Sequence, residues 1–309
     1  MEEPKMVLDN LRNILFISFP IVLLVLFIVT SIIAGKSIKP VLKIIETSSI
    51  ISTKNLKSRI LMPKNKDELY VLSKTINDLL DRIENAIERE KQFTSDASHE
   101  LRTPLAVIKG TLEVLIRKPR EKEEYEGKIN YCISEVDRVN NLVDQLLLLA
   151  RFENQKVIIN KQKVALNEII LESLERNSNG IRDKKIGINF TFSEHFMVNT
   201  DAYKVSIIIE NILSNAIKYS HENGSISILL SNERDVVKCE ILDNGIGISP
   251  LDIEKIYEQF YRSKPTEHPA IKGNGLGLSI VKRLCDLLDI TVSIESNEEI
   301  GTKVTLYFN

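Results

Sequence analysis

The stretch Phe93-Thr94-Ser95-Asp96-Ala97-Ser98-His99-Glu100-Leu101-Arg102-Thr103-Pro104-Leu105 predicts a helix that continues beyond its last residue. Apolar side chains recur every three or four positions and predict one buried stripe, made of Phe93, Ala97, Leu101, Leu105, Ile108, Leu112 and Leu115. His99 is expected on the opposite, exposed face, with Thr103 one turn further along. Pro104 cannot donate to the carbonyl oxygen of Glu100, so we expect a bend there, at a cost of up to about 3 kcal/mol. The stretch alone fits two interpretations, a reactive histidine or an ordinary surface histidine beside a tolerated kink.

Length and composition limit the class of protein. A chain of 309 residues is long enough for about two or three modules. Charged residues make up 27% and hydrophobic residues 43%, with a net charge of -2, which fits soluble domains plus one apolar segment. No basic excess indicates a nucleic-acid partner, so none is expected. Cys132, Cys239 and Cys285 lie far apart in apolar surroundings, which favours buried thiols in a reducing compartment rather than disulfides or a metal site.

Residues 14–34 form an apolar run that is long enough to cross a bilayer of about 30 Å as a helix. Acidic residues before the run argue against a signal peptide. Lys36, Lys39 and Lys43 follow it, which favours a cytoplasmic C-terminal side. Residues 1–13 are therefore expected to be a short extracytoplasmic segment, and the rest of the chain is expected to be cytoplasmic.

Residues 35–88 are predicted to form two helices joined by a polar connector. An amphipathic stretch covers residues 38–51, the connector residues 52–67, and a second helix begins near Glu68. Its apolar residues follow a strict heptad: Leu69, Leu72, Ile76, Leu79, Ile83 and Ala86. This seam predicts a parallel coiled coil and hence a homodimer, the alternative being a helix packed within one chain. Behind a membrane span, the arrangement resembles a HAMP linker. The period changes between Ala86 and Phe93, which alters local supercoiling.

Residues 89–154 are predicted to form a helical hairpin. The helix that carries His99 should end near Arg117, and Pro119 marks the turn. A second helix follows, with an apolar stripe of Ile129, Ile133, Val136, Val139, Val143, Leu146 and Ala150. Such a hairpin still needs a partner surface, which dimerisation into a four-helix bundle would supply. His99 would then lie on the outside of the bundle.

Beyond Asn154 the pattern changes to short strands alternating with helices. Strand-like runs occupy residues 186–192, 225–231, 235–242, 290–294 and 303–308, and helical runs occupy residues 167–176, 201–219 and 276–288. The pattern predicts a separate α+β domain, residues 155–309, with helices packed on a sheet. The predicted fold is therefore multidomain: a transmembrane helix, an all-α linker and dimeric four-helix bundle, and an α+β sandwich.

The helix predicted at residues 201–219 carries Asn211, Asn215 and Lys218 as a polar stripe beside its apolar face. Asparagine is a poor helix former, so two aligned carboxamides need a reason. Carboxamide oxygens can bind a hard cation such as Mg²⁺, and a lysine can bind phosphate. The alternative is an ordinary solvated face.

Two glycine-bearing segments follow. Asp243-Asn244-Gly245-Ile246-Gly247 ends a predicted strand, where Asn-Gly alone is a common hairpin signal. The carboxylate of Asp243 could instead accept a hydrogen bond from an adenine amino group, with the glycines letting the ring approach the backbone. Gly273-Asn274-Gly275-Leu276-Gly277 opens the last predicted helix, where free backbone amides suit phosphate. A lone glycine-rich turn is weak evidence, and this one lacks the lysine-serine pair of a Walker motif.

Taken in order, these segments resemble the bacterial sensor histidine kinases, over residues 34–309. His99-Glu-Leu-Arg-Thr-Pro-Leu105 resembles the H box of that family, and Asn211 to Tyr219 its N box. The segment Asp243 to Gly247 resembles the first glycine box, Phe260-Tyr-Arg262 the F box, and Gly273 to Leu278 the second glycine box. Any one of these could arise by chance, but five in order hardly could.

The resemblance implies a site for ATP and Mg²⁺. Asn211 and Asn215 would hold Mg²⁺ on the phosphates with Lys218 beside them, Asp243 would read adenine, and Tyr219 would pack near it. The segment between Phe260 and Gly273 would act as an ATP lid. The full set of implied cofactor-binding residues adds Gly245, Gly247, Phe260, Arg262, Gly273, Gly275, Leu276 and Gly277.

The resemblance also implies the reaction. His99 would attack the γ-phosphorus of ATP while Glu100 accepts the proton from the other ring nitrogen. The phosphoryl group would pass to an aspartate of a response regulator, and Thr103 would orient a water when the same protein dephosphorylates that regulator. The protein is thus expected to be a homodimer in the bacterial plasma membrane, with cytoplasmic catalytic domains.

Two alternatives stay open. ATPases of the gyrase, heat-shock chaperone and mismatch-repair type carry a glutamate base where Asn211 stands, so asparagine disfavours hydrolysis here. A membrane scaffold or phosphatase could also bind nucleotide only as a structural ligand. The chain departs from most members of the family in showing one span rather than two spans around a sensor domain.

Overall fold

The computed structural model describes residues 3–50, 55–63, 66–153, 158–192, 194–233, 236–263, 271 and 273–308. It consists of two compact units, Met1–Gln92 and Phe93–Asn309. Helix α2 (Glu68–Leu115) begins in the first unit and ends in the second.

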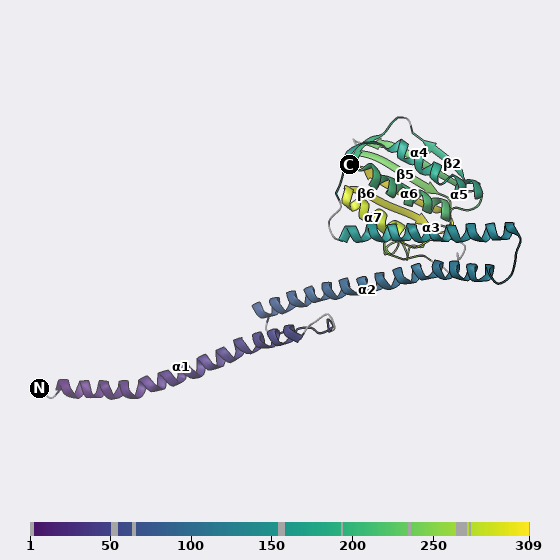
Figure 1. Cartoon of the computed structure of the whole chain (residues 1–309). Helices are drawn as coiled ribbons and strands as arrows, with labels where there is room; N and C mark the ends of the chain where they lie inside the picture. Colours follow the sequence, from purple (N-terminus) through teal and green to yellow (C-terminus); the bar gives the residue numbers. More distant parts are fainter. Residues whose placement is uncertain are drawn as a thin grey trace. The chain divides into compact units, whose positions relative to one another are not determined.

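The first unit begins with helix α1 (Glu3–Ile50), which includes the apolar segment Ile14–Gly35 (Figure 1). This segment has a mean hydropathy of 2.8 and is the one helical stretch among the described residues long and apolar enough to cross a membrane. The predicted apolar helix is therefore confirmed, and its passage through a membrane stays a prediction. The amphipathic stretch after it is not a separate helix, because α1 continues without a break to Ile50.

A connector at residues 55–63 is bound to the N-terminal half of α2. Ile60 N donates to Asn77 Oδ1 and Asn77 Nδ2 donates to Ile60 O, both at 2.9 Å. Arg59 forms ion pairs with Asp81 and Glu84. Side chains on one face of α2 thus hold the connector, which follows the predicted order of helix, connector and helix.

Helix α2 begins at Glu68, as predicted, because Asp67 Oδ1 accepts hydrogen bonds from the backbone N–H groups of Leu69 and Tyr70, each at 3.2 Å. It runs to Leu115 and contains Pro104. The helix is continuous through this proline, so the bend expected near Glu100 does not break it, and the bend itself stays a prediction.

Helix α3 (Lys122–Glu153) follows a turn and completes the predicted hairpin. Its predicted apolar stripe is largely exposed in the single chain, and Ile133 is 53% exposed. A second stripe that the sequence did not indicate is buried instead, made of Cys132, Glu135, Leu142 and Leu149. Leu142 and Leu149 join the core of the C-terminal domain, so α3 uses one face for that domain and leaves the other exposed.

The C-terminal domain holds a five-stranded sheet in the order β2-β4-β5-β7-β6 and a two-stranded sheet of β1 and β3. The strands are β1 (Gln162–Ala165), β2 (Gly187–Thr191), β3 (Met197–Thr200), β4 (Ser225–Glu233), β5 (Val236–Asp243), β6 (Ile290–Asn297) and β7 (Gly301–Phe308). Strands β2 and β4 are parallel, and all other neighbours are antiparallel. The strands of the larger sheet were all predicted, whereas β1 and β3 were missed because each has only four residues.

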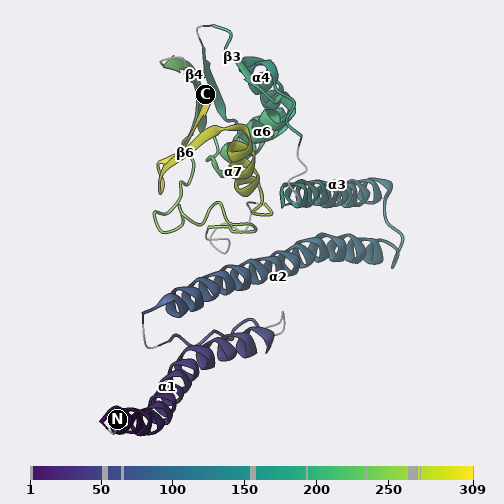
Figure 2. The same cartoon turned by 90° about the vertical axis from the view of Figure 1, so that its left-hand side faces the viewer.

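Helices α4 (Leu166–Arg176), α6 (Ala202–Tyr219) and α7 (Gly277–Leu288) cover one face of the larger sheet (Figure 2). The short helix α5 (Ser178–Asp183) was not predicted. The buried face of α6 contains the predicted residues Val205, Ile208, Ile209, Ile212, Leu213, Ala216 and Ile217. Burying each of these larger aliphatic side chains contributes about 1.5–3 kcal/mol. The predicted α+β architecture is confirmed, and the polar side of α6 is turned away from the core.

Candidate nucleotide-binding site

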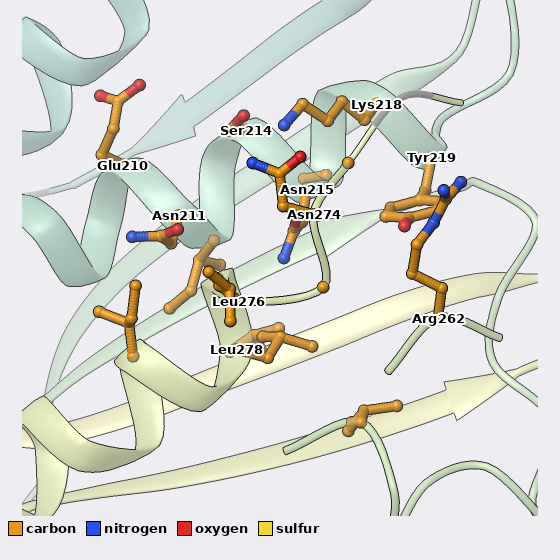
Figure 3. Close-up of a pocket in the computed structure, with 18 of the residues that line it drawn as sticks. Glu210, Asn211, Ser214, Asn215, Lys218, Tyr219, Arg262, Asn274, Leu276 and Leu278 are labelled. Carbon is orange, nitrogen blue, oxygen red and sulfur yellow. The ribbon is translucent and has the colours of Figure 1, made fainter. Parts of the chain in front are cut away.

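Helix α6 carries Asn211, Asn215 and Lys218 along one wall of a cleft of about 1570 Å³ (Figure 3). Asn211 Nδ2 donates to the carbonyl oxygen of Ile207 at 2.8 Å, so the carboxamide has a fixed orientation. Its Oδ1 is the end that approaches Gly277 at the start of α7. The predicted polar stripe is therefore the wall of a cleft rather than an ordinary solvated face.

The side chain of Lys218 runs back along α6 toward Asn215, so its ammonium lies within the cleft (Figure 3). Desolvation there lowers the pKa of Lys218, although Glu210 opposes the shift, and Arg138 adds to it. The residue as a whole is exposed because the cleft is open. Its ammonium group is nevertheless surrounded by enough protein atoms to lose part of its hydration. An anion bound in the cleft would favour the charged form.

Asp243, the last residue of β5, is buried with 6% of its surface exposed. Its Oδ1 accepts hydrogen bonds from the backbone N–H groups of Gly245 (2.9 Å) and Thr302 (3.2 Å). Burial raises the pKa of Asp243, although these two N–H groups and His221 act in the opposite direction. The carboxylate is thus held rigidly at the cleft, where its acceptor capacity is suited to a ligand that donates a hydrogen bond.

Gly245 and Gly247 allow the loop after β5 to touch neighbouring backbone. A Cβ on Gly245 would collide with the carbonyl of Tyr219, and one on Gly247 with the carbonyl of Asn297. Gly247 also has a φ of +69°, which favours glycine. Gly247 lines the cleft, whereas Gly245 lies behind it against the end of α6.

The second glycine-bearing segment forms the opposite wall. Gly275 has a φ of +67°, and a Cβ there would collide with the backbone of Phe260. A Cβ on Gly277 would lie 2.8 Å from Asn211 Oδ1. Leu276 is 1% exposed and anchors the start of α7. Among the described residues, a Cβ on Gly273 would meet no atom within 4 Å, so none of their contacts requires glycine at that cleft-lining position.

The F-box segment lies beside this wall. Phe260 has a φ of +63° and donates its backbone N–H to Gly275 O at 2.9 Å. Its ring packs against Phe93 of α2 with the centroids 5.7 Å apart, so it supports the cleft from outside rather than lining it. Arg262 does line the cleft and donates to Ile271 O at 2.6 Å. Most of the predicted ATP lid, residues 264–270 and 272, lies outside the described residues.

His99 is exposed on α2, as predicted, and Glu100 beside it is half-buried. Thr103 is exposed on the same helix, and its Oγ1 donates to His99 O at 3.1 Å. None of these three side chains lines the cleft. The structure therefore brings together most of the residues expected to bind cofactor but leaves the expected phosphoryl acceptor outside.

The cleft is also lined by residues that were not candidate site residues in the sequence, among them Asn274, Leu278 and Arg138. Asn274 and Leu278 flank the glycines of the second motif (Figure 3) and could have been found from that position. Arg138 comes from α3 and donates to Asn274 Oδ1 at 3.4 Å. No sequence pattern indicated that α3 would contribute to this cleft.

The C-terminal domain has the features of a nucleotide-binding domain: a helix with two aligned asparagines, a buried aspartate at the end of a strand, and a glycine-bounded helix start. It is joined to a helical hairpin that bears an exposed histidine. Family models agree. Residues 32–85 match the HAMP domain, residues 89–155 the His Kinase A (phospho-acceptor) domain, and residues 200–309 the histidine kinase-, DNA gyrase B- and HSP90-like ATPase. These three domains, in this order, are those of the sensor histidine kinases of two-component systems, so the predicted resemblance is confirmed.

The signal transduction histidine-protein kinase ArlS of Staphylococcus epidermidis is 28% identical over 312 residues, which cover 97% of this chain and 67% of the relative. The histidine kinase ThkA, solved in complex with the response regulator protein TrrA, has a TM-score of 0.57 and 23% identity over 74% of this chain and 65% of that chain. Full-length ShkA in complex with AMPPNP has a TM-score of 0.53 and 24% identity over 71% of this chain and 45% of that chain. At these identities the two structural similarities show a shared fold.

Proposed function

We propose that this kinase takes the γ-phosphoryl group of Mg-ATP onto His99 and passes it to an aspartate of a response regulator. The observation that carries the proposal is the convergence of Asn211, Asn215, Lys218 and Asp243 on one cleft, in the same compact unit as an exposed histidine. Phosphoryl transfer depends mainly on positioning and on neutralising charge, and these side chains are suited to both.

Asp243 would accept a hydrogen bond from the adenine amino group, because its other hydrogen bonds already fix the carboxylate at the strand end. Tyr219 would pack near the ring. At the opposite wall, the backbone amides from Gly273 to Gly277 would face the phosphates, as helix N-termini do in other anion sites. Arg262 and Lys218 would add positive charge.

The carboxamides fit Mg²⁺. Asn211 Nδ2 is engaged by the carbonyl of Ile207, which leaves Oδ1 as the end that a cation can meet. Mg²⁺ in nucleotide sites takes one or two protein oxygens and completes its shell with phosphates and water. Asn211 and Asn215 would therefore hold the ion, which would neutralise charge on the phosphates when bound.

In the reaction, an imidazole nitrogen of His99 would bond to the γ-phosphorus as the bond from that phosphorus to the β,γ-bridging oxygen breaks and ADP leaves. Glu100 would accept the proton from the other ring nitrogen and so hold the nucleophilic tautomer. Because His99 does not line the cleft, the transfer needs a rearrangement of the domain within the chain or the His99 of a second protomer.

A homodimer is supported by apolar surface that the single chain leaves exposed. Leu72 and Leu79 of the heptad seam are 47% and 54% exposed, and Leu105 of the histidine helix is 54% exposed. Burying such residues on association is favourable, and a four-helix bundle would cover them. His99 and Thr103 would stay outside, where a response regulator could dock and where Thr103 could orient a water for dephosphorylation. The complex of ThkA with its regulator supports this class of partner.

The domain division that we propose follows from the same elements. Residues 1–13 would be extracytoplasmic, residues 14–34 would span the bacterial plasma membrane, and residues 35–88 would form the HAMP linker. Residues 89–154 would form the dimerisation hairpin, and residues 155–309 the ATP-binding domain, both in the cytoplasm.

An ATPase that hydrolyses with a glutamate base is disfavoured by the hydrogen bonds of Glu210, the carboxylate next to Asn211. Glu210 accepts from Ser173 Oγ (2.7 Å), Arg176 Nε (3.1 Å) and Asn177 Nδ2 (2.6 Å). These bonds hold it toward α4, away from the carboxamide of Asn211 (Figure 3).

The test uses the full chain in lipid nanodiscs with γ-labelled ATP and Mg²⁺. Wild-type protein should acquire an acid-labile, base-stable label that is lost in His99→Gln and transferred to a regulator aspartate. A label that persists in His99→Gln, or steady ATP hydrolysis without any label, would refute the proposal.

A further inference from the structure

The last turn of α6 delivers Lys218 and Tyr219 to the cleft, yet its own carbonyl groups are bound by a lysine outside every motif. Lys184 Nζ donates to the carbonyl oxygens of Ile217 (3.0 Å), Lys218 (2.6 Å) and Ser220 (2.9 Å). The remaining carbonyl in this run, that of Tyr219, accepts from the backbone N–H of Ile246 at 3.2 Å. All four carbonyls thus have donors that come from other parts of the domain.

The last carbonyls of a helix have no partners within the helix and carry its partial negative charge. A basic side chain in the last turn often satisfies them. In α6 that residue is Lys218, but its ammonium lies in the cleft. Lys184 takes over this function, and its three N–H donors match the three carbonyls that it contacts.

Lys184 is itself fixed in place. It is the C-cap residue of α5, and its carbonyl oxygen accepts the backbone N–H of Asn223 at 2.8 Å. Its side chain is half-buried, and desolvation lowers its pKa, with Glu222 as the opposing charge. An ammonium in such surroundings is costly unless its donors are used, and here all three are used.

We propose that Lys184 is a positioning residue for the nucleotide site. By binding the last turn of α6 from behind, it leaves the ammonium of Lys218 free for the phosphates and holds Tyr219 against Gly245, next to Asp243. The inference rests on the proposed binding of ATP in the cleft. Without Lys184, the carbonyls of Ile217, Lys218 and Ser220 would lose their donor, and the ammonium of Lys218 would turn back to its own helix end.

The experiment measures equilibrium binding of Mg-AMPPNP by the full chain in lipid nanodiscs, below the unfolding midpoint of each variant. Lys184→Met keeps the length of the side chain and removes its donors, and we expect affinity to fall about tenfold, equivalent to about 1.4 kcal/mol. Because Lys184 acts through Lys218, the loss in Lys184→Met/Lys218→Met should be clearly smaller than the product of the two single losses.

Lys238→Met is the matched control. Lys238 forms an ion pair with Glu240 at 3.2 Å in the same domain and does not line the cleft. Lys238→Met should leave the affinity for Mg-AMPPNP unchanged, both in the wild type and in combination with Lys218→Met. Unchanged affinity in Lys184→Met, or losses that multiply in the double variant, would overturn the inference.

Lys184→Arg provides a second test, which remains possible even if Lys184→Met does not fold. A planar guanidinium cannot reproduce three tetrahedral donors, so we expect intermediate affinity. Binding as tight as in the wild type would contradict the three-donor geometry. Wild-type protein that fails to bind Mg-AMPPNP would instead overturn the proposed function, and the inference with it.

Discussion

Asn211 and Gly277 meet across the cleft: a Cβ placed on Gly277 would lie only 2.8 Å from Asn211 Oδ1. Real Cβ atoms are not found so close to a neighbouring atom. The carboxamide of Asn211 can therefore keep its orientation only because residue 277 is glycine and has no side chain. The contact joins the asparagine helix α6 to the first residue of α7. Two motifs far apart in the sequence therefore depend on each other.

Gly277→Ala should displace the carboxamide of Asn211 and lower the rate of His99 phosphorylation about tenfold or more, since metal ligands tolerate little misplacement. The fold should change little in stability, because the atom that must move belongs to a side chain and alanine favours a helix. Rates at saturating and at low Mg²⁺ would measure the effect, which should be larger at low Mg²⁺.

Gly127→Ala is the control for this prediction, because Gly127 is an exposed residue of α3 outside the cleft and a Cβ there would meet no atom of the described residues within 4 Å. This variant should phosphorylate His99 at a rate within about twofold of the wild type, as expected for surface substitutions. Equal losses in both variants would mean that the loss in Gly277→Ala does not come from the contact with Asn211.

Asp243→Asn should change nucleotide preference. Asparagine can still accept from the backbone N–H groups of Gly245 and Thr302 through Oδ1, so the loop after β5 should keep its shape. Its amide nitrogen would then face the adenine amino group donor to donor, and ATP binding should weaken about 10- to 100-fold. Inosine triphosphate has a carbonyl in place of that amino group, so its affinity for Asp243→Asn should fall much less. Competition binding of ATP and inosine triphosphate to the wild type and the variant would measure this difference.

The same substitution should stabilise the nucleotide-free protein at neutral pH. Burial raises the pKa of Asp243 in the folded state, so folding disfavours its ionised form. An acid with a raised pKa is least costly to the fold below its unfolded pKa, and the penalty grows as pH rises through the folded value. The unfolding midpoint of Asp243→Asn should therefore exceed that of the wild type at pH 7 to 8, and the gap should narrow toward pH 4. A gap that widens on acidification would contradict this reading.

The sequence predicted the parts of the fold that repeat. The heptads of α2 and the apolar face of α6 are periodic, so their elements could be placed within a few residues. The stripe of Asn211, Asn215 and Lys218 was also predictable, because helical spacing alone decides which residues share a face. Asp243 and the glycines were found because turn chemistry restricts which residues can occupy such positions.

What the sequence could not predict depends on contacts between distant segments. Lys184 looks like any surface lysine until α5 is placed beside the end of α6. Leu142 and Leu149 looked like members of a simple hairpin helix, although they join the core of the C-terminal domain. The packing of Phe93 on Phe260 joins two motifs through a contact that neither motif indicates by itself.

Pro104 provides the last prediction. It is buried within the continuous helix α2, five residues after His99, and it cannot donate to Glu100 O. Pro104→Ala would restore that hydrogen bond and stiffen the segment that presents His99. If bending there is needed for His99 to meet the γ-phosphate, the rate of autophosphorylation should fall about tenfold. Dephosphorylation of the regulator, for which Thr103 would orient a water, should be largely unchanged.

Pro119→Ala is the control. It removes a proline in the turn after α2 without restoring a helical hydrogen bond, and it should leave both activities unchanged. Measuring both activities on the same preparations separates the two cases: an unchanged ratio in Pro104→Ala would show that the bend is incidental to signalling.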